Sequence, residues 1–170
     1  MSNGVTNFGG IAGGALRSQH DVIYHVHDYF SFDEDHIVAI TLRYFNSKEV
    51  VVEDSFRHYI NMVSRNIYGN QHTRKGKVIK HFAVTEKDNE HRFHSHATIA
   101  VRKDITSLDE FKETLNLCYL KHRNRMRSKN GIKIEEVYSD GWNTYICKLR
   151  SKEDGFLAAI DPSTFRSAIG

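Results

Sequence analysis

The chain has 170 residues, of which 39% are hydrophobic and 26% charged, and its formal net charge is +3. This length suits one well-buried domain and is marginal for two. No apolar run approaches the ~20 residues of a membrane span, and no apolar signal segment stands at the N-terminus. The sequence also lacks a Gly-x-x-x-x-Gly-Lys-[Ser/Thr] loop. We therefore expect a cytoplasmic protein with no membrane partner, no nucleotide cofactor and no fused ATP-driven helicase.

Residues 1–19 are rich in Gly, Ser and Asn, and we expect them to form a flexible N-terminal arm. Residues 20–170 are expected to form a single domain with its core between residues 36 and 152. The loosely alternating segment His20–Phe30 fits either an edge strand or an ordered part of the arm.

The first half of the domain is predicted to run strand, helix, strand, strand. His36–Tyr44 is β-branched and nearly continuously apolar, which is typical of a central strand. Glu53–Tyr68 carries apolar residues at three- and four-residue spacing, which predicts a helix. Asn70–Gly76 is expected to be a polar, basic loop. Lys77–Glu86 and Phe93–Arg102 are predicted strands joined by a connection of hairpin length.

The second half adds a long helix, a short strand and a last helix. Ser107–Arg127 is the longest predicted helix, and its first residue forms a capping-box pattern with Glu110. Ile132–Tyr138 is a predicted strand, and a final helix is expected from residue 141 to about residue 152. This order of elements favours an α+β fold, in which helices flank a central antiparallel sheet of four to five strands.

Two histidines, His94 and His96, stand at the start of the predicted strand Phe93–Arg102. Strand side chains alternate between faces, so the two imidazoles point the same way from Cα atoms about 7 Å apart. Antiparallel pairing across the preceding connection brings Glu86 beside them. A carboxylate with two imidazoles suits Mg²⁺, Mn²⁺ or another first-row divalent ion. Surface histidines at a hydrated strand end fit the same pattern without a metal.

The last predicted helix carries Tyr145 and, three residues later, Lys148, so the two side chains share a helix face. Trp142 lies about one turn earlier on the same side. A tyrosine oxygen can act as a nucleophile on phosphorus, and a neighbouring ammonium can hold the phosphate or stabilise the phenolate. A packed tyrosine beside a surface lysine is the structural alternative.

Together and in this order, these patterns resemble the HUH endonuclease superfamily, specifically the rolling-circle replication initiators (Rep) with a single catalytic tyrosine. The family's His–hydrophobe–His motif, followed by an apolar strand, corresponds to residues 92–99. Its Tyr-x-x-Lys motif corresponds to Tyr145-Ile146-Cys147-Lys148, and its apolar strand with a Thr-Leu core to Ile37–Arg43. The resemblance spans residues 36–152.

One residue departs from the family pattern, because Ser95 replaces the hydrophobe between the two histidines. Its side chain is expected to face away from the metal, toward a covering helix or the core. His91 offers a rival ligand. Its spacing of three residues from His94 does not keep both on one strand face, so His94 and His96 are preferred.

The resemblance implies a metal-dependent DNA nicking endonuclease that initiates rolling-circle replication, encoded by a plasmid of a prokaryotic host or by a virus. Glu86, His94 and His96 would hold the metal, Mg²⁺ or Mn²⁺. Tyr145 would become covalently linked to the 5′ phosphate, and Lys148 would orient the phosphate or help to activate Tyr145. The partners would be single-stranded DNA at a replication origin and a host helicase.

Basic residues gather in two segments, Arg74–Lys80 and Lys121–Lys129. We expect both segments to bind DNA phosphates, an interaction that weakens steeply with salt. Trp142 and Tyr138 can stack on unpaired bases. The complete set of expected DNA-binding residues is Arg74, Lys75, Lys77, Lys80, Arg123, Arg125, Arg127 and Trp142.

Two other functions stay open. A single-tyrosine transposase of the same superfamily combines similar motifs, although Tyr-x-x-Lys and the position of Glu86 favour the initiator. A non-catalytic module that binds single-stranded nucleic acid would also use a sheet with aromatic and basic residues, but it leaves the histidines and Tyr145 unexplained as a set. A relaxase is disfavoured because its nucleophile precedes the histidine motif.

Overall fold

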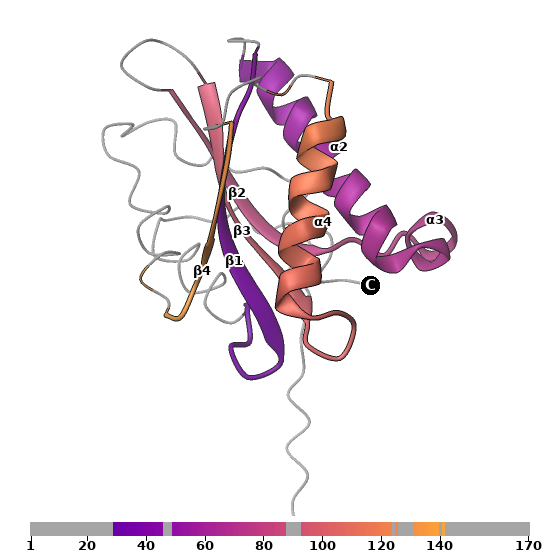
Figure 1. The fold of residues 1–170 in the computed structure, drawn as a ribbon. Helices are drawn as coiled ribbons and strands as arrows, with labels where there is room; N and C mark the ends of the chain where they lie inside the picture. Colours follow the sequence, from indigo (N-terminus) through magenta and orange to yellow (C-terminus); the bar gives the residue numbers. More distant parts are fainter. Residues whose placement is uncertain are drawn as a thin grey trace, which may run out of the picture.

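The computed structural model describes residues 29–45, 49–87, 93–123, 125, 131–139 and 141. Its elements in chain order are β1 (Asp35–Arg43), α2 (Glu49–Tyr68), α3 (Asn70–Lys75), β2 (Lys80–Lys87), β3 (Phe93–Arg102), α4 (Leu108–Lys121) and β4 (Ile132–Glu136). The strands form one antiparallel sheet in the order β2-β3-β1-β4, and Figure 1 shows α2 and α4 on one side of it. The predicted α+β fold is confirmed. The arm predicted at residues 1–19 and the last predicted helix, beyond Gly141, lie outside the described residues.

One face of the sheet packs against α2 and α4, and we call it the helix face. It carries alternate residues of each strand, among them Val38, Ile40 and Leu42 of β1, all buried. The helices contribute apolar side chains at helical spacing to this interface, as predicted for α2. The main contributors from the helices are Val52, Phe56, Tyr59, Ile60, Val63, Phe111, Leu115, Cys118 and Tyr119.

The opposite face carries His94 and His96, and we call it the histidine face. Its central side chains are also buried, and they are Ile37, Ala39, Phe82, Val84, Thr98 and Ala100. Since both faces of the central strands are buried, these strands read as nearly continuous apolar runs in the sequence. Polar side chains lie around this apolar centre, and Glu86, His94 and His96 lie at the end where β1 and β2 finish and β3 begins.

The prediction of a loop at Asn70–Gly76 is wrong, because most of this segment forms the short helix α3. Gly69 and Gly76 flank this helix with positive φ angles of 52° and 67°, a conformation that glycine adopts without strain. α3 has no buried residue, so no apolar periodicity marks it in the sequence. The basic residues of its last turn favour the helix, because they offset the negative end of its dipole.

The helix α4 ends at Lys121, well before its predicted end at Arg127. His122 has an extended backbone, and its buried ring lies 6.1 Å from the ring of Tyr44. Arg125 then forms a β-bridge with Tyr44. Pairing with the sheet thus overrides the helical propensity of this basic segment. The other elements have the predicted type, with ends shifted by a few residues. Among the described residues, no helix has the length and apolar character needed to cross a membrane.

The predicted capping box fixes the start of α4. The Ser107 Oγ accepts a hydrogen bond from the Glu110 N–H at 3.3 Å, and the Ser107 N–H donates to Glu110 Oε2 at 3.1 Å. Two backbone N–H groups that the helix cannot pair internally are thereby satisfied. The cap sets the phase of α4, so that Phe111 and Leu115 face the core.

Replacement of Ser107 by alanine is expected to lower the free energy of unfolding by about 1 kcal/mol, because the Glu110 N–H loses its acceptor. Urea denaturation measures this change, with an unchanged m-value as the sign that only stability has altered. Ser107→Asp keeps an acceptor and serves as the matched control. Equal stability of the alanine variant and the wild type would show that the cap contributes nothing.

Candidate metal centre

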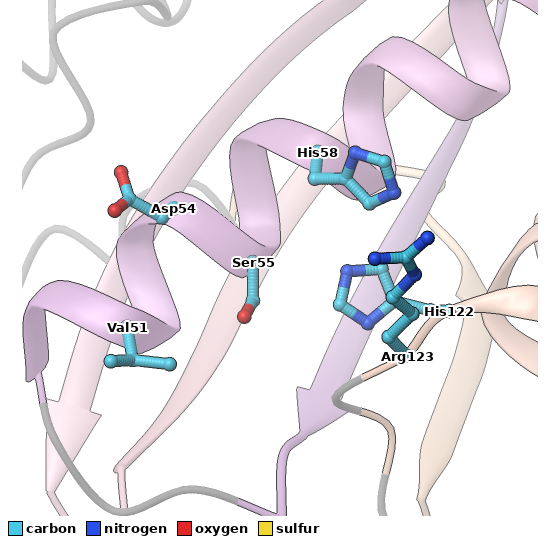
Figure 2. A pocket seen from close by; sticks show the side chains of 6 residues that line it. All are labelled: Val51, Asp54, Ser55, His58, His122 and Arg123. Carbon is cyan, nitrogen blue, oxygen red and sulfur yellow. The ribbon is translucent and has the colours of Figure 1, made fainter.

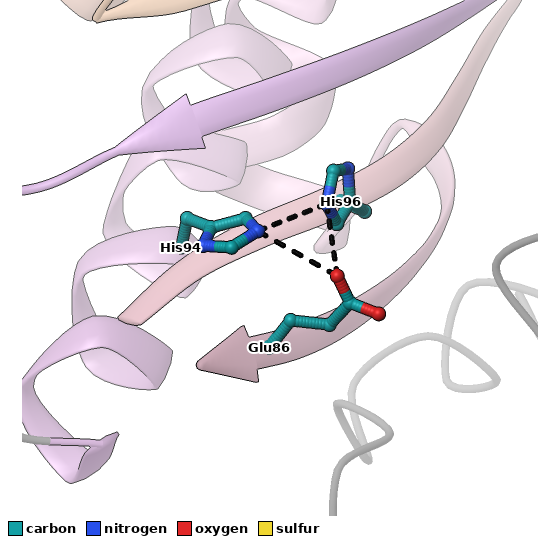
Figure 3. A group of neighbouring side chains, drawn as sticks. All are labelled: Glu86, His94 and His96. Atoms are coloured by element: carbon teal, nitrogen blue, oxygen red, sulfur yellow. Dashed lines mark hydrogen bonds and ion pairs between the residues drawn. The ribbon is translucent and has the colours of Figure 1, made fainter. Parts of the chain in front are cut away.

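Backbone pairing gathers the three predicted ligands at the polar end of the histidine face. Glu86, the penultimate residue of β2, is the antiparallel partner of His94 in β3. His96 follows two residues later, so it projects from the same face. Figure 3 shows the three side chains pointing toward one another from two neighbouring strands.

The ligand atoms of these three side chains lie close together. His94 Nε2 and His96 Nε2 are 3.0 Å apart, and Glu86 Oε2 lies 3.1 Å from His96 Nε2 and 3.6 Å from His94 Nε2. Two imidazole nitrogens at this distance need a proton on one of them or a cation between them, because their lone pairs repel. The side chains are 15%, 15% and 33% exposed for His94, His96 and Glu86, so a solute can reach them.

These spacings fit one divalent ion. Bonds of about 2.1 Å to ligands in adjacent positions of an octahedral ion place the ligand atoms about 3 Å apart. The three separations between Glu86, His94 and His96 cluster around that value. A set of two imidazoles and one carboxylate on one side of an ion leaves its other positions open to substrate. Within the described part of the chain, no second group of three His, Cys, Asp or Glu side chains comes as close.

The Glu86 carboxyl is held ionised by its neighbours. Hydrogen bonding to His94 and then to His96 lowers the pKa of Glu86 to about 2, and this effect outweighs burial, which acts in the opposite direction. Glu86 is therefore a carboxylate at any pH near neutrality, which is the form that binds a cation.

Thr41 is a further residue of the site, and sequence reasoning gave it no chemical role. It is the antiparallel partner of His96 on β1, and its Oγ1 lies 3.0 Å from His96 Nδ1. With Nε2 directed at the other ligands, the Nδ1–H can donate to Thr41, which fixes the tautomer and the ring orientation. Thr41 belongs to the Thr-Leu core that matched the family pattern, but only the strand register places it beside His96.

Ser95 lies as predicted, with its side chain directed away from the ligands. Ser95 lies between the two histidines in the sequence, and its side chain is buried on the opposite, helix face. Its Oγ has no hydrogen-bond partner among the described residues. An unsatisfied buried hydroxyl costs stability. The departure from the family pattern therefore affects packing and leaves the ligand set unchanged.

The first basic segment lies at the other end of the sheet from the ligands. Lys80 begins β2 and Glu86 nearly ends it, a separation of about 20 Å along the strand. Lys80 Nζ binds the buried Asp35 carboxylate at 2.8 Å, and Lys77 Nζ lies 4.5 Å from the centre of the Tyr68 ring. Arg74 and Lys75 precede these residues in α3, so the expected DNA contacts of this segment would be distant from the ligands.

The described arginines of the second basic segment, Arg123 and Arg125, lie at the same end of the sheet as the ligands but toward its helix face. Arg123 lines an open hollow of about 240 Å³, together with His58 and His122, whose ring centres are 5.3 Å apart (Figure 2). Arg125 pairs with Tyr44, a buried residue of the helix face. Bridge partners project to the same side of a sheet, so neither arginine joins the histidine face.

Several predicted site residues lie outside the described residues, namely Arg127, Trp142, Tyr145 and Lys148, as does the rejected ligand His91. Tyr138, by contrast, lies among the residues that the structure describes. It is 82% exposed and follows β4 at the end remote from the histidines, since Glu136 pairs with Val38. A base stacked on Tyr138 would therefore not lie beside the ligands.

Comparison with known proteins identifies no relative of this chain. No protein-family model matches the sequence, and no curated protein or solved structure matches it either.

Mn²⁺ is expected to raise the melting temperature of the protein, because an ion that binds only the folded state stabilises it. Thr41→Val removes the hydroxyl beside His96 with little change in shape. It should raise the Mn²⁺ concentration at half-maximal shift about 10- to 100-fold, as loss of a supporting hydrogen bond does at other metal sites. Thermal melts across a Mn²⁺ titration measure both effects.

Thr41→Ser keeps the hydroxyl and is the matched control, and His58→Ala tests a histidine on the other side of the sheet. Both should retain the midpoint of the wild type. A Thr41→Val midpoint equal to that of the wild type would contradict the orienting role of Thr41. A wild type without any Mn²⁺ response would contradict the metal site itself.

Proposed function

We propose that this protein is a metal-dependent endonuclease that nicks single-stranded DNA through Tyr145, of the kind that initiates rolling-circle replication in the HUH superfamily. The observation that carries the proposal is the convergence of Glu86, His94 and His96 at separations of 3.0 to 3.6 Å. The sequence motifs alone predict this set of ligands, and the fold supplies a rigid sheet to hold it.

The position of the cluster supports a catalytic use. The centre of the histidine face is largely apolar and buried. The three ligands lie together at one end of this face and stay partly accessible. On an ordinary exposed surface, polar side chains are scattered and each is hydrated separately. Here the ligand atoms of two imidazoles and one carboxylate lie within 3.6 Å of one another, which is the arrangement that a cation requires.

Glu86, His94 and His96 would hold the ion, and Thr41 would keep the His96 ring in place. A divalent ion bound there supplies Lewis acidity at a phosphate oxygen. The three side chains stay partly exposed, at 15% for each histidine and 33% for Glu86, so a phosphate can reach an ion that they hold.

The bond changes would involve Tyr145 and the phosphodiester of the bound strand. The phenol oxygen loses its proton and forms a bond to phosphorus, and the bond between phosphorus and the 3′ oxygen breaks. The protein then carries the 5′ phosphate, and the departing strand ends in a 3′ hydroxyl that has gained a proton. Lys148, three residues after Tyr145, would hold the phosphate or stabilise the phenolate during this exchange. The energy of the broken ester is kept, so rejoining needs no ATP.

A binding module without catalysis is the competing proposal from another class. It would explain exposed aromatic and basic side chains, but it gives no role to the ligand cluster or to its orientation by Thr41. A single-tyrosine transposase would use the same chemistry on another substrate. Covalent capture of DNA separates the binding module from both enzymes.

The wild type is expected to form a covalent adduct with a random-sequence library of single-stranded DNA in the presence of Mn²⁺. Because the 5′ phosphate stays on the protein, label at the 3′ end of the DNA should appear on the protein in a denaturing gel, and label at the 5′ end should not. Tyr145→Phe and a chelator should each abolish the labelled band.

Tyr138→Phe is the matched control, since it removes an exposed hydroxyl at the other end of the sheet, and it should leave the adduct intact. Survival of the adduct in Tyr145→Phe would reject the nucleophile. Survival after chelation, or after joint replacement of His94 and His96 by alanine, would reject the metal site. Absence of an adduct with the wild type would reject the proposal as a whole.

A further inference from the structure

The end of β1 lies directly beside the ligand cluster and carries an arginine. Arg43 is the antiparallel partner of His94, so their Cα atoms are about 5 Å apart and their side chains project from the same face. Arg43 is exposed. Its long side chain can therefore reach the space next to the open side of Glu86, His94 and His96.

The backbone of Arg43 is fixed from two sides. Its N–H donates to the Gly131 carbonyl at 2.8 Å, and its carbonyl accepts from the Tyr119 hydroxyl at 2.7 Å. Tyr119 is buried in the core, so α4 anchors this point of the strand. These bonds fix the backbone position from which the Arg43 side chain extends beside the ligands.

Two residues later, Phe45 is 85% exposed, although Tyr44 between them is buried. A single exposed phenylalanine is common and alone indicates nothing. This one differs because it follows Arg43 at the edge of the ligand cluster. An exposed aromatic ring next to a cation is the pairing that holds an unpaired nucleotide, through its base and its phosphate.

A second cation on the same face, Lys133, is partly neutralised. It pairs with Thr41 across the sheet, and its Nζ lies 2.9 Å from Glu135 Oε1. Lys133 also lies one strand farther from the histidines than Arg43, which pairs directly with His94, so Arg43 is the stronger candidate for a phosphate contact.

We propose that Arg43 and Phe45, which we call the β1 tip, bind the nucleotide adjoining the phosphate that is cut. Arg43 contacts its backbone phosphate, and Phe45 stacks on its base. This inference rests on the proposed function, since it places the β1 tip on the strand held at the ligand cluster. Stacking needs an unpaired base, so the β1 tip selects single-stranded over duplex DNA.

The test measures binding of a fluorescent oligothymidylate by anisotropy, with every variant made in a Tyr145→Phe background that is expected to bind but not cut. Phe45→Ala should weaken binding about 5- to 100-fold, the range found when one stacking platform is lost, and Phe45→Trp should restore it. Arg43→Gln should lower the slope of log Kd against log salt by about one, because one phosphate contact is lost. Duplex DNA should bind equally well to Phe45→Ala and to its parent.

Matched controls occupy the other end of the same sheet. Arg102→Gln removes an exposed arginine of the histidine face that binds Asp104, and Ile105→Ala removes an exposed apolar side chain just after β3. Neither should change the affinity or the salt slope. Circular dichroism and melting temperatures of all the variants should match those of the parent, since each changed side chain is exposed.

Unchanged oligothymidylate binding in both β1-tip variants would overturn the inference, as would equal losses in the two controls or a parent that does not bind. The adduct assay on the wild type gives an independent result. Adduct formation together with unchanged binding would reject the β1 tip and keep the nicking function. Weaker binding in the β1-tip variants without any wild-type adduct would keep the β1 tip as a nucleic-acid contact and reject the nicking function.

Discussion

Pairing between β2, β3 and β1 is the constraint on which the site depends. Glu86 lies opposite His94, and His96 lies opposite Thr41, so three strands supply one cluster through backbone register alone. A slip of one residue would send Glu86 to the helix face if it occurred between β2 and β3, and Thr41 if it occurred between β1 and β3. The two buried faces of the central strands oppose such a slip, because it would place side chains of the wrong size and shape in both close-packed layers.

The core gives this register its rigidity. α2 and α4 cover the helix face, and tyrosine hydroxyls tie α4 to its surroundings at two points: Tyr59 donates to the Leu115 carbonyl at 3.1 Å, and Tyr119 donates to the Arg43 carbonyl at 2.7 Å. The second bond connects the helical layer to the strand end beside the ligands. Packing, register and the candidate site are therefore linked through the end of β1.

Local sequence patterns predicted much of this arrangement. Alternation and apolar runs identified all four described strands, and the parity of His94 and His96 with the short connection after Glu86 predicted the cluster. Features without a local signal were missed. The helix α3 buries nothing, and α4 stops where Arg125 pairs with the sheet.

Long-range register could not be predicted from sequence, and it decides which residues surround the ligands. It brings Thr41 to His96 and Arg43 to His94, although each pair is separated by about fifty residues in the chain. It also separates the ligands from Lys80, at the far end of β2. Basic residues that look equivalent in the sequence therefore lie at different distances from the candidate metal centre.

The central claim is that Glu86, His94 and His96 bind one divalent ion. The most direct test is anomalous diffraction from crystals grown with Mn²⁺. One strong peak is expected about 2.0 to 2.3 Å from Glu86 Oε2, His94 Nε2 and His96 Nε2. Crystals that contain Mn²⁺ elsewhere but show no peak between these three atoms would contradict it.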